Sequence, residues 1–222
     1  MSTASPRSRR PYRHGIRRSG VGYRRTDLIG NILSVRGATP KITDDAFIAS
    51  TAVIIGDVEI GSGSNVRYHC VLRGDIHEIR VGKNANIQDG TVVHVARNRF
   101  GTYIGDEVTI GHMVLIHACT LQDGSMVGMH ATVMDGAVVE EGALVAAGAL
   151  VTPGERVKSG EIWGGSPARF IRKVSKKDIA MINRIPSSYL ELGREYRDAG
   201  LDLRQAHPLD GPMEDAAERA LR

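Results

Sequence analysis

The chain has 222 residues, of which 41% are hydrophobic and only 5% aromatic, and it carries a formal net charge of +4. This length suffices for one sizeable domain with tails, and no apolar run approaches the roughly 18 residues that a membrane-spanning helix needs. The two cysteines, Cys70 and Cys119, form no CxxC pair, so the sequence indicates neither a disulfide framework nor a secreted protein. Few rings and 26 glycines predict thin repeated layers with frequent turns.

The positive charge is concentrated near the start of the chain. Eight arginines lie between Arg7 and Arg25, and the first acidic residue is Asp27. A segment rich in Arg and Ser without acids is typical of a mitochondrial targeting segment, cleaved or retained. A basic arm lying on a partner protein is the second interpretation, and nucleic-acid binding, with only two tyrosines to stack on bases, is the third. A solvated tail is compatible with the first two, so residues 1–42 are interpreted as an Arg-rich arm or targeting segment.

From residue 43 onward, aliphatic residues recur every six positions. This spacing fits neither a helix of period 3.6 nor the simple alternation of a strand. It is typical of a left-handed parallel β-helix of hexapeptide repeats, in which three six-residue units make one triangular coil. We therefore expect an all-β solenoid over residues 43–165, with the repeated aliphatic side chain pointing inward. The repeated residues are Ile48, Ile54, Ile60, Val66, Leu72, Val81, Ile87, Val93, Ile104, Ile110, Ile116, Leu121, Val127, Val133, Val139, Val145 and Val151.

Three register breaks interrupt this period. The steps after Leu72 and Val93 are nine and eleven residues long, and the step after Ile116 is only five. Insertions in a solenoid become surface loops, often on the binding side. We therefore expect loops after Leu72 and after Val93.

The period fades after Pro153, and a helix is predicted from about residue 175 to residue 199. Ser175 is a candidate N-cap, and Asp178 lies in the first turn, where acidic side chains are favourable. Pro186 lies inside this segment, and because proline disrupts a helix interior, we expect two helical pieces. Residues 166–222 are thus predicted to be a C-terminal helical segment and tail.

Counting units around the triangular coil places two histidines together. If the unit at Val93 lies on face A, the next units fall on faces B and C, and the unit at Ile116 returns to face A. His94 and His117 directly follow these inward residues, so both point outward from face A. They lie on adjacent coils, about 4.8 Å apart at the backbone. Two imidazoles at that spacing can share a metal ion.

The same arithmetic assigns His112 to a different face. It lies near a corner of face C, with Asp89 in the same slot one coil earlier and Gln88 beside it, while Arg73 shares the column of His94. One prism cannot bring both faces to a single metal. We therefore expect a closed trimer in which face A of one subunit meets face C of the next. The remaining histidines follow no such pattern and are expected to be ordinary surface or structural residues: His14, His69, His77, His130 and His207.

With these positions in place, four segments resemble the signature of the γ-class carbonic anhydrase family. They are VLRGD (Val71–Asp75), NIQDG (Asn86–Gly90), VVHVA (Val92–Ala96) and IGHMVLIHAC (Ile110–Cys119). The likeness runs from about residue 42 to residue 173. It implies reversible hydration of CO₂ to bicarbonate at a metal site between the subunits of a homo- or heterotrimer.

The resemblance also assigns the metal ligands. They fall on His94, His112 and His117, with Zn²⁺ as the expected ion and Fe²⁺ as the alternative. Three neutral imidazoles would leave one position of the metal for water.

Five further residues receive roles from the same resemblance. Arg73 and Asp75 form the ion pair that joins subunits, and Gln88 and Asp89 belong to the active site. Tyr189 corresponds to a tyrosine near the metal on the C-terminal helix. Arg73 and Asp89 are also candidates for binding bicarbonate or for supporting the ligands.

Among members of this family, the sequences of two segments look most like those of the γ-carbonic-anhydrase-like subunits of mitochondrial respiratory complex I in plants and protists. These segments are VAAGALV (Val145–Val151) and EIWGGSPARFIRK (Glu161–Lys173). The implied location is the mitochondrial matrix, peripheral to the inner membrane, with the membrane arm of complex I as partner. The bacterial cytoplasm is the alternative location, and nucleic acid is not an expected partner.

Two departures from the archaeal type bear on activity. That type has an acidic loop with a proton-shuttling Glu, whereas the loop here, VARNRFGTY, has no acid. Ser187 and Ser188 also stand where an Asn is expected. Catalysis is therefore expected to be weak or absent, and a non-catalytic assembly subunit that keeps the metal is the alternative function. A hexapeptide acyltransferase is less favoured, because those enzymes usually combine one catalytic His with a CoA cleft.

A reporter tests the targeting interpretation. A fluorescent protein fused behind residues 1–29 is expected to reach the mitochondrial matrix, because the segment is rich in arginine and lacks acids before Asp27. Fractionation and microscopy measure the location, and the same segment with its eight arginines changed to glutamine is the matched control. A cytosolic reporter from the unchanged segment would favour the docking arm instead.

Overall fold

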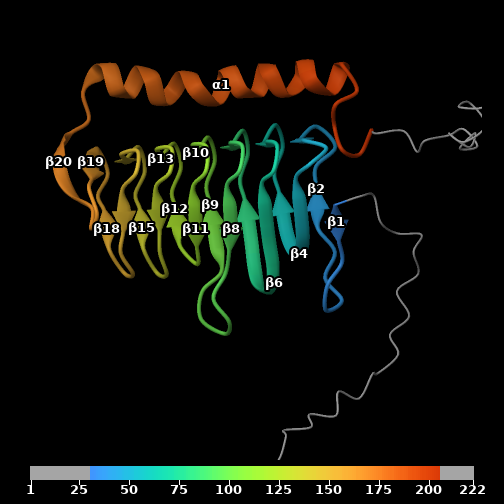
Figure 1. The fold of residues 1–222 in the computed structure, drawn as a ribbon. Coiled ribbons are helices and arrows are strands. Elements are labelled where there is room, and N and C mark those ends of the chain that lie inside the picture. Colours follow the sequence, from blue (N-terminus) through green and yellow to red (C-terminus); the bar gives the residue numbers. More distant parts are fainter. Residues whose placement is uncertain (1–30, 206–222) are drawn as a thin grey trace, which may run out of the picture.

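The structure is a computed structural model that describes residues 31–205. It shows a parallel β-solenoid with one long helix along one side (Figure 1), so the expected fold class is confirmed. The Arg-rich segment before residue 31, the tail after residue 205, His14 and His207 lie outside the described residues. Strands β1 (Ile32–Leu33) and β2 (Lys41–Ile42) precede residue 43, where we expected the solenoid to begin, and both pair with β4 (Val53–Ile60).

The elements in chain order are β1 (Ile32–Leu33), β2 (Lys41–Ile42), β3 (Phe47–Ile48), β4 (Val53–Ile60), β5 (Asn65–Val66), β6 (Val71–Val81), β7 (Asn86–Ile87), β8 (Val92–His94), β9 (Thr102–Ile104), β10 (Thr109–Ile110), β11 (Leu115–His117), β12 (Thr120–Leu121), β13 (Met126–Val127), β14 (Thr132–Val133), β15 (Val138–Val139), β16 (Leu144–Val145), β17 (Leu150–Val151), β18 (Arg156–Val157), β19 (Glu161–Gly164), β20 (Arg169–Lys173) and α1 (Lys176–Asp198).

The strands form the three faces that the sequence arithmetic requires. Face A runs through β6, β8, β11, β14 and β17, and face B through β6, β9, β12, β15 and β18. Face C is the eight-stranded sheet that contains β3, β5, β7, β10, β13, β16, β19 and β20. Ile116 pairs with Val93 on face A, and Ile110 pairs with Ile87 on face C. The expected face assignment is therefore confirmed.

The repeated aliphatic side chains fill the interior of the prism and are almost fully buried. Each stacks on its equivalent one coil away, so removal of apolar surface from water stabilises every added coil. Cys70 and Cys119 are part of this interior, and both are free. Burial raises the pKa of each thiol to about 12, so neither is a thiolate at neutral pH.

Only one of the two expected insertion loops forms. The extra residues after Leu72 continue as strand β6, which passes from face A to face B beside β4, so the expectation of a loop there was wrong. The two backbones approach closely at the bend, where a Cβ on Gly56 would lie 2.4 Å from the carbonyl oxygen of Gly74. Pairing with β4 thus satisfies the backbone groups that a loop would expose to water. The insertion after Val93 does form a loop, which a bridge between Ala96 and Phe100 closes.

Helix α1 begins as predicted, with a capping box at its N-terminus. The Ser175 hydroxyl accepts from the backbone N–H of Asp178, and the Asp178 carboxylate accepts from the backbone N–H of Ser175. The expectation of two helical pieces was wrong, because the helix continues through Pro186. Ile182, Pro186 and Gly193 are buried on the face toward the solenoid, so packing on both sides of the proline holds the axis where one backbone hydrogen bond is missing.

The helix runs back along the solenoid over face C (Figure 1). A buried guanidinium helps to hold it there. Arg67 of face C is only 5% exposed, and its Cζ lies 4.4 Å from the ring centre of Tyr196, with Phe47 and Tyr189 around it. None of the helices in residues 31–205 has the length and apolar character needed to cross a membrane.

The chain after α1 is attached to the beginning of face C. The buried Asp202 carboxylate accepts hydrogen bonds from the backbone N–H of Ile48 and from Arg204. Burial opposes ionisation of this group, but the hydrogen bonds from Arg204 and Ile48 prevail and lower the pKa of Asp202.

Removing this carboxylate tests the attachment. Asp202→Ala leaves the Arg204 guanidinium without a carboxylate, although it still donates to backbone carbonyls. The change is expected to cost about 3 kcal/mol of unfolding free energy at neutral pH, measured by urea denaturation. Because the folded-state pKa is lowered, the stabilisation is present above the unfolded pKa of about 3.9 and is lost as pH falls through the folded value. The difference between wild type and variant should therefore shrink in acid. Asp198→Ala, at the exposed end of α1, is the control, and an equal loss in that variant would contradict the assignment.

Candidate metal centre

His94 and His117 lie side by side on face A. They end strands β8 and β11 and pair in register on adjacent coils. Their ring centres are 5.2 Å apart, and Nδ1 of His94 lies 3.3 Å from Nε2 of His117. The expected placement of both residues is confirmed, while their role as ligands stays a prediction.

Each of these two rings also contacts a carboxylate through its other nitrogen. Nε2 of His94 is 3.2 Å from Oδ1 of Asp75, and Nδ1 of His117 is 2.5 Å from Oδ1 of Asp135. An ionised carboxylate can only accept hydrogen bonds, so these two ring nitrogens carry the protons. In the neutral rings, the lone pairs then lie on Nδ1 of His94 and Nε2 of His117.

Two lone pairs that face each other cannot form a hydrogen bond, so a proton or a cation must complete the pair. The ligand nitrogens of a tetrahedral zinc ion with bonds of 2.0–2.1 Å are about 3.3–3.4 Å apart. The separation of 3.3 Å between His94 and His117 therefore fits two neighbouring positions of such a metal. Neutral imidazole is also the donor that zinc prefers.

The surroundings favour the neutral form of His94. Burial lowers the pKa of its imidazole and the nearby Arg73 guanidinium adds to this effect, although Asp75 opposes it. Partial burial acts against ionisation of Asp75, but hydrogen bonds from Arg73 and His94 lower the pKa of its carboxyl group. A neutral ring beside an ionised carboxylate is the state that metal binding requires.

The Arg73–Asp75 pair forms within one strand. Nη1 of Arg73 lies 2.7 Å from Oδ2 of Asp75, two residues further along β6. The resemblance assigned this pair to the contact between subunits. Within a single chain, Arg73 and Asp75 already form an ion pair with each other, and the Asp75 carboxylate also contacts the His94 ring.

His112 lies at the corner after face C, next to Asp89. Its Nδ1 is 3.0 Å from Oδ2 of Asp89, and 37% of its side chain is exposed. Within residues 31–205, no group of three or more His, Cys, Asp and Glu side chains could hold a metal ion. A single chain thus does not bring His112 to the other two histidines.

The simple docking of face A onto face C needs correction. Helix α1 covers face C, so that face is not free to meet another subunit. The corner that carries His112 stays exposed. In the expected trimer, contact with a second copy would therefore use this corner rather than the whole of face C.

The other predicted active-site residues lie on the His112 side. Gln88 is buried, and its Nε2 donates to Oδ1 of Asn86 at 3.0 Å. Asp89 accepts from the backbone N–H of Tyr68 at 3.1 Å. Tyr189 packs from α1, where burial raises the pKa of its hydroxyl. These groups cluster with His112 and not with His94.

Asp135 is the site residue that our sequence reasoning missed. It lies two places after the inward Val133, one coil beyond His117. On face A we followed only the residue directly after each inward aliphatic, whereas on face C the second residue after the aliphatic, Asp89 or His112, was already among the site candidates. Considering the second residue after each inward aliphatic on face A as well would have indicated Asp135.

The loop after β8 adjoins this site. Arg97, Asn98 and Arg99 are exposed, and the Arg99 guanidinium lies 5.4 Å from the ring centre of Phe100. Phe100 in turn packs on Gly136, next to Asp135. The loop therefore places positive charge, and no acid of its own, beside the histidines.

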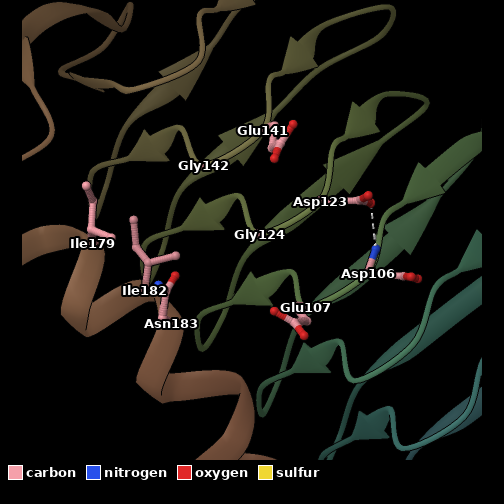
Figure 2. A pocket seen from close by; sticks show the side chains of 9 residues that line it. All are labelled: Asp106, Glu107, Asp123, Gly124, Glu141, Gly142, Ile179, Ile182 and Asn183. Carbon is pink, nitrogen blue, oxygen red and sulfur yellow. Dashed lines mark hydrogen bonds between the residues drawn. The ribbon is translucent and has the colours of Figure 1, made fainter.

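A groove lined by acidic side chains lies elsewhere, between α1 and the turns that follow face B (Figure 2). Asp106 and Asp123 in its wall accept hydrogen bonds from backbone N–H groups of neighbouring coils. Ile182 of α1 closes the opposite side. The two aspartates are thus turn-forming residues of the solenoid, at a different corner from His112.

Comparison with known proteins places the chain among hexapeptide-repeat proteins. No family model matches the chain. It is 44% identical over 191 residues to "Gamma carbonic anhydrase 1, mitochondrial" of Arabidopsis thaliana, covering 83% of this chain and 70% of that protein. It is 40% identical over 166 residues to "Carbonic anhydrase" of Geobacillus kaustophilus, covering 75% of this chain and 91% of that protein.

A solved structure agrees with this grouping. The crystal structure of a hexapeptide transferase family protein from Anaplasma phagocytophilum superposes with a TM-score of 0.73 at 46% identity. The match covers 76% of this chain and 99% of that one. The solenoid is therefore shared along nearly the whole of that neighbour.

Proposed function

The chain belongs to the γ-carbonic anhydrase family, and we propose that it hydrates CO₂ reversibly at a metal site shared between subunits. The ligands in this proposal are His94 and His117 of one subunit and His112 of the next, with Zn²⁺ as the metal and Fe²⁺ as the alternative. The observation that carries it is the separation of 3.3 Å between two ring nitrogens whose lone pairs face each other.

Exposed apolar side chains support a trimer around this site. Val92 and Leu115 stand next to each other on face A, directly before the inward residues of the two histidine strands, and both are more than a third exposed. Met113 and Met129, at the corner near His112, are more than half exposed. Burying these side chains between copies would supply the association energy, and a closed ring of three would use both surfaces of every subunit.

In this proposal, each polar residue around the metal has a specific role. When bound, the metal ion supplies a nucleophile for CO₂ by lowering the pKa of water to about 7. Gln88 keeps its Oε1 as an acceptor that can orient this water, since its Nε2 donates to Asn86. The partly exposed Arg73 guanidinium provides positive charge for bicarbonate. Asp89 holds His112, and Tyr189 borders the His112 side from α1.

The location and partner in this proposal follow from the relatives and from the N-terminus. The matched Arabidopsis protein carries the word mitochondrial in its name, and eight arginines precede the first acid of this chain. We infer a place in the mitochondrial matrix on the membrane arm of respiratory complex I, within a homo- or heterotrimer. The basic loop after β8 favours one second candidate, a non-catalytic assembly subunit that keeps the metal.

Proton transfer provides the first test. The zinc-loaded trimer is expected to hydrate CO₂ slowly in a non-transferring buffer, because the loop from Val95 to Gly101 contains no acid to carry the proton to bulk water. Adding an imidazole buffer should raise the turnover, measured by stopped flow. His117→Ala is the inactive control.

Two results would contradict this expectation. Rapid turnover that ignores the buffer would mean that another group transfers the proton. No turnover under any buffer, from protein with stoichiometric metal, would overturn the catalytic proposal and favour the assembly subunit.

Complementation between variants provides the second test. Homotrimers of His94→Ala or of His112→Ala should bind metal poorly, because every site lacks one of its three proposed ligands. In a mixed trimer, face A of a His112→Ala chain meets the His112 corner of a His94→Ala chain at one junction. That junction has all three ligands, so co-refolding should restore up to one tightly bound metal per mixed trimer.

Metal analysis after size exclusion measures this recovery. A mixture of His94→Ala with His117→Ala is the matched control, because both changes damage face A and no junction becomes complete. Mixed trimers that stay empty in both combinations would show that the placement of His112 is wrong.

A further inference from the structure

We propose that Asp135 is a positioning residue, which holds His117 in the tautomer that presents Nε2 to the metal. Asp75 has the converse task and presents Nδ1 of His94. This inference rests on the proposed metal site and adds to it the ligand atoms and the groups that select them.

The contact between Asp135 and His117 is short and well supported. Oδ1 of Asp135 lies 2.5 Å from Nδ1 of His117, with both side chains less than a third exposed. The backbone around Asp135 is fixed from two sides, because Gly136 N–H donates to Ala118 O and Gly154 N–H donates to Asp135 O. The carboxylate is thus presented by two coils of the solenoid and not by a free loop.

The tautomer matters because the two rings face each other. If His117 carried its proton on Nε2, that N–H would point at Nδ1 of His94, only 3.3 Å away. The two histidines would then hydrogen-bond to each other and occupy the position of the metal. By accepting a hydrogen bond from Nδ1–H, Asp135 keeps the proton on that nitrogen and prevents this closed state.

Asp75 completes the arrangement on the other ring. It lies 3.2 Å from Nε2 of His94, so the two rings of face A offer different atoms, Nδ1 and Nε2, to one point. His112 follows the rule of His117, since Asp89 contacts its Nδ1 and leaves its Nε2 available. Every proposed ligand therefore has its own carboxylate.

The test compares Asp135→Ala and Asp135→Asn with wild type, using the full-length trimer. Glu141→Ala is the matched control, because Glu141 is an exposed carboxylate on a turn that follows face B, away from the histidines. The first measurement is the dissociation constant for Zn²⁺, from competition with a chelator. The second is the tautomer of the ring nitrogens in metal-free protein, from ¹⁵N NMR of labelled histidine.

Asp135→Ala is expected to weaken Zn²⁺ binding about 10- to 100-fold and to move the His117 proton from Nδ1 to Nε2. Asp135→Asn keeps an acceptor oxygen and should lose less. It also carries the test if the alanine variant does not assemble. A residue with a purely structural role would leave the tautomer unchanged.

Two results would overturn the inference. One is a wild-type His117 that carries its proton on Nε2. The other is Zn²⁺ binding by both Asp135 variants within twofold of the Glu141→Ala control. Because neither measurement uses CO₂, a trimer that behaves as expected here but hydrates no CO₂ would overturn the proposed function and leave the positioning role standing.

Discussion

The in-register stacking of one coil on the next fixes the histidines and carboxylates of the site. An inward aliphatic residue is buried in the prism, and the residue after it must point outward, so Val93 and Ile116 determine where His94 and His117 lie. Coils repeat at about 4.8 Å, a spacing that brings two imidazoles within reach of one ion. Burial of the apolar residues thus determines the positions of the polar side chains on the surface next to them.

This regularity explains which features could be predicted from the sequence. The faces follow from counting, and the start of α1 follows from Ser175 and Asp178, because both depend on local periodicity or capping. The failures have a different cause. The residues after Leu72 became strand because β4 lies alongside, and Pro186 was tolerated because the helix packs on face C. Contacts between distant segments decided each case, and no local pattern encodes them.

The charge balance of the centre also depends on distant segments. Three neutral imidazoles contribute no charge, so a divalent cation would bring two positive charges to a partly buried place. The carboxylates of Asp75 and Asp135 would offset this charge on face A, while the Arg73 guanidinium would reduce that compensation. Asp75 lies on β6 and Asp135 in the turn after β14, on opposite sides of the histidine strands. Only Asp75 falls within the signature segments, so reading those segments found only that carboxylate.

The course of the chain after α1 has a consequence for the ends of the solenoid. A stack of parallel strands presents an unpaired edge at each end, which can recruit further strands and grow into fibres. On face C, the edge at β3 is occupied by the returning chain, where Asp202 bridges Ala49 and Leu203 N–H donates to Ile48 O. At the other end, β20 pairs with β19 in the antiparallel direction. Neither end of this sheet therefore offers the parallel template that another solenoid could extend, so end-to-end growth along face C is blocked.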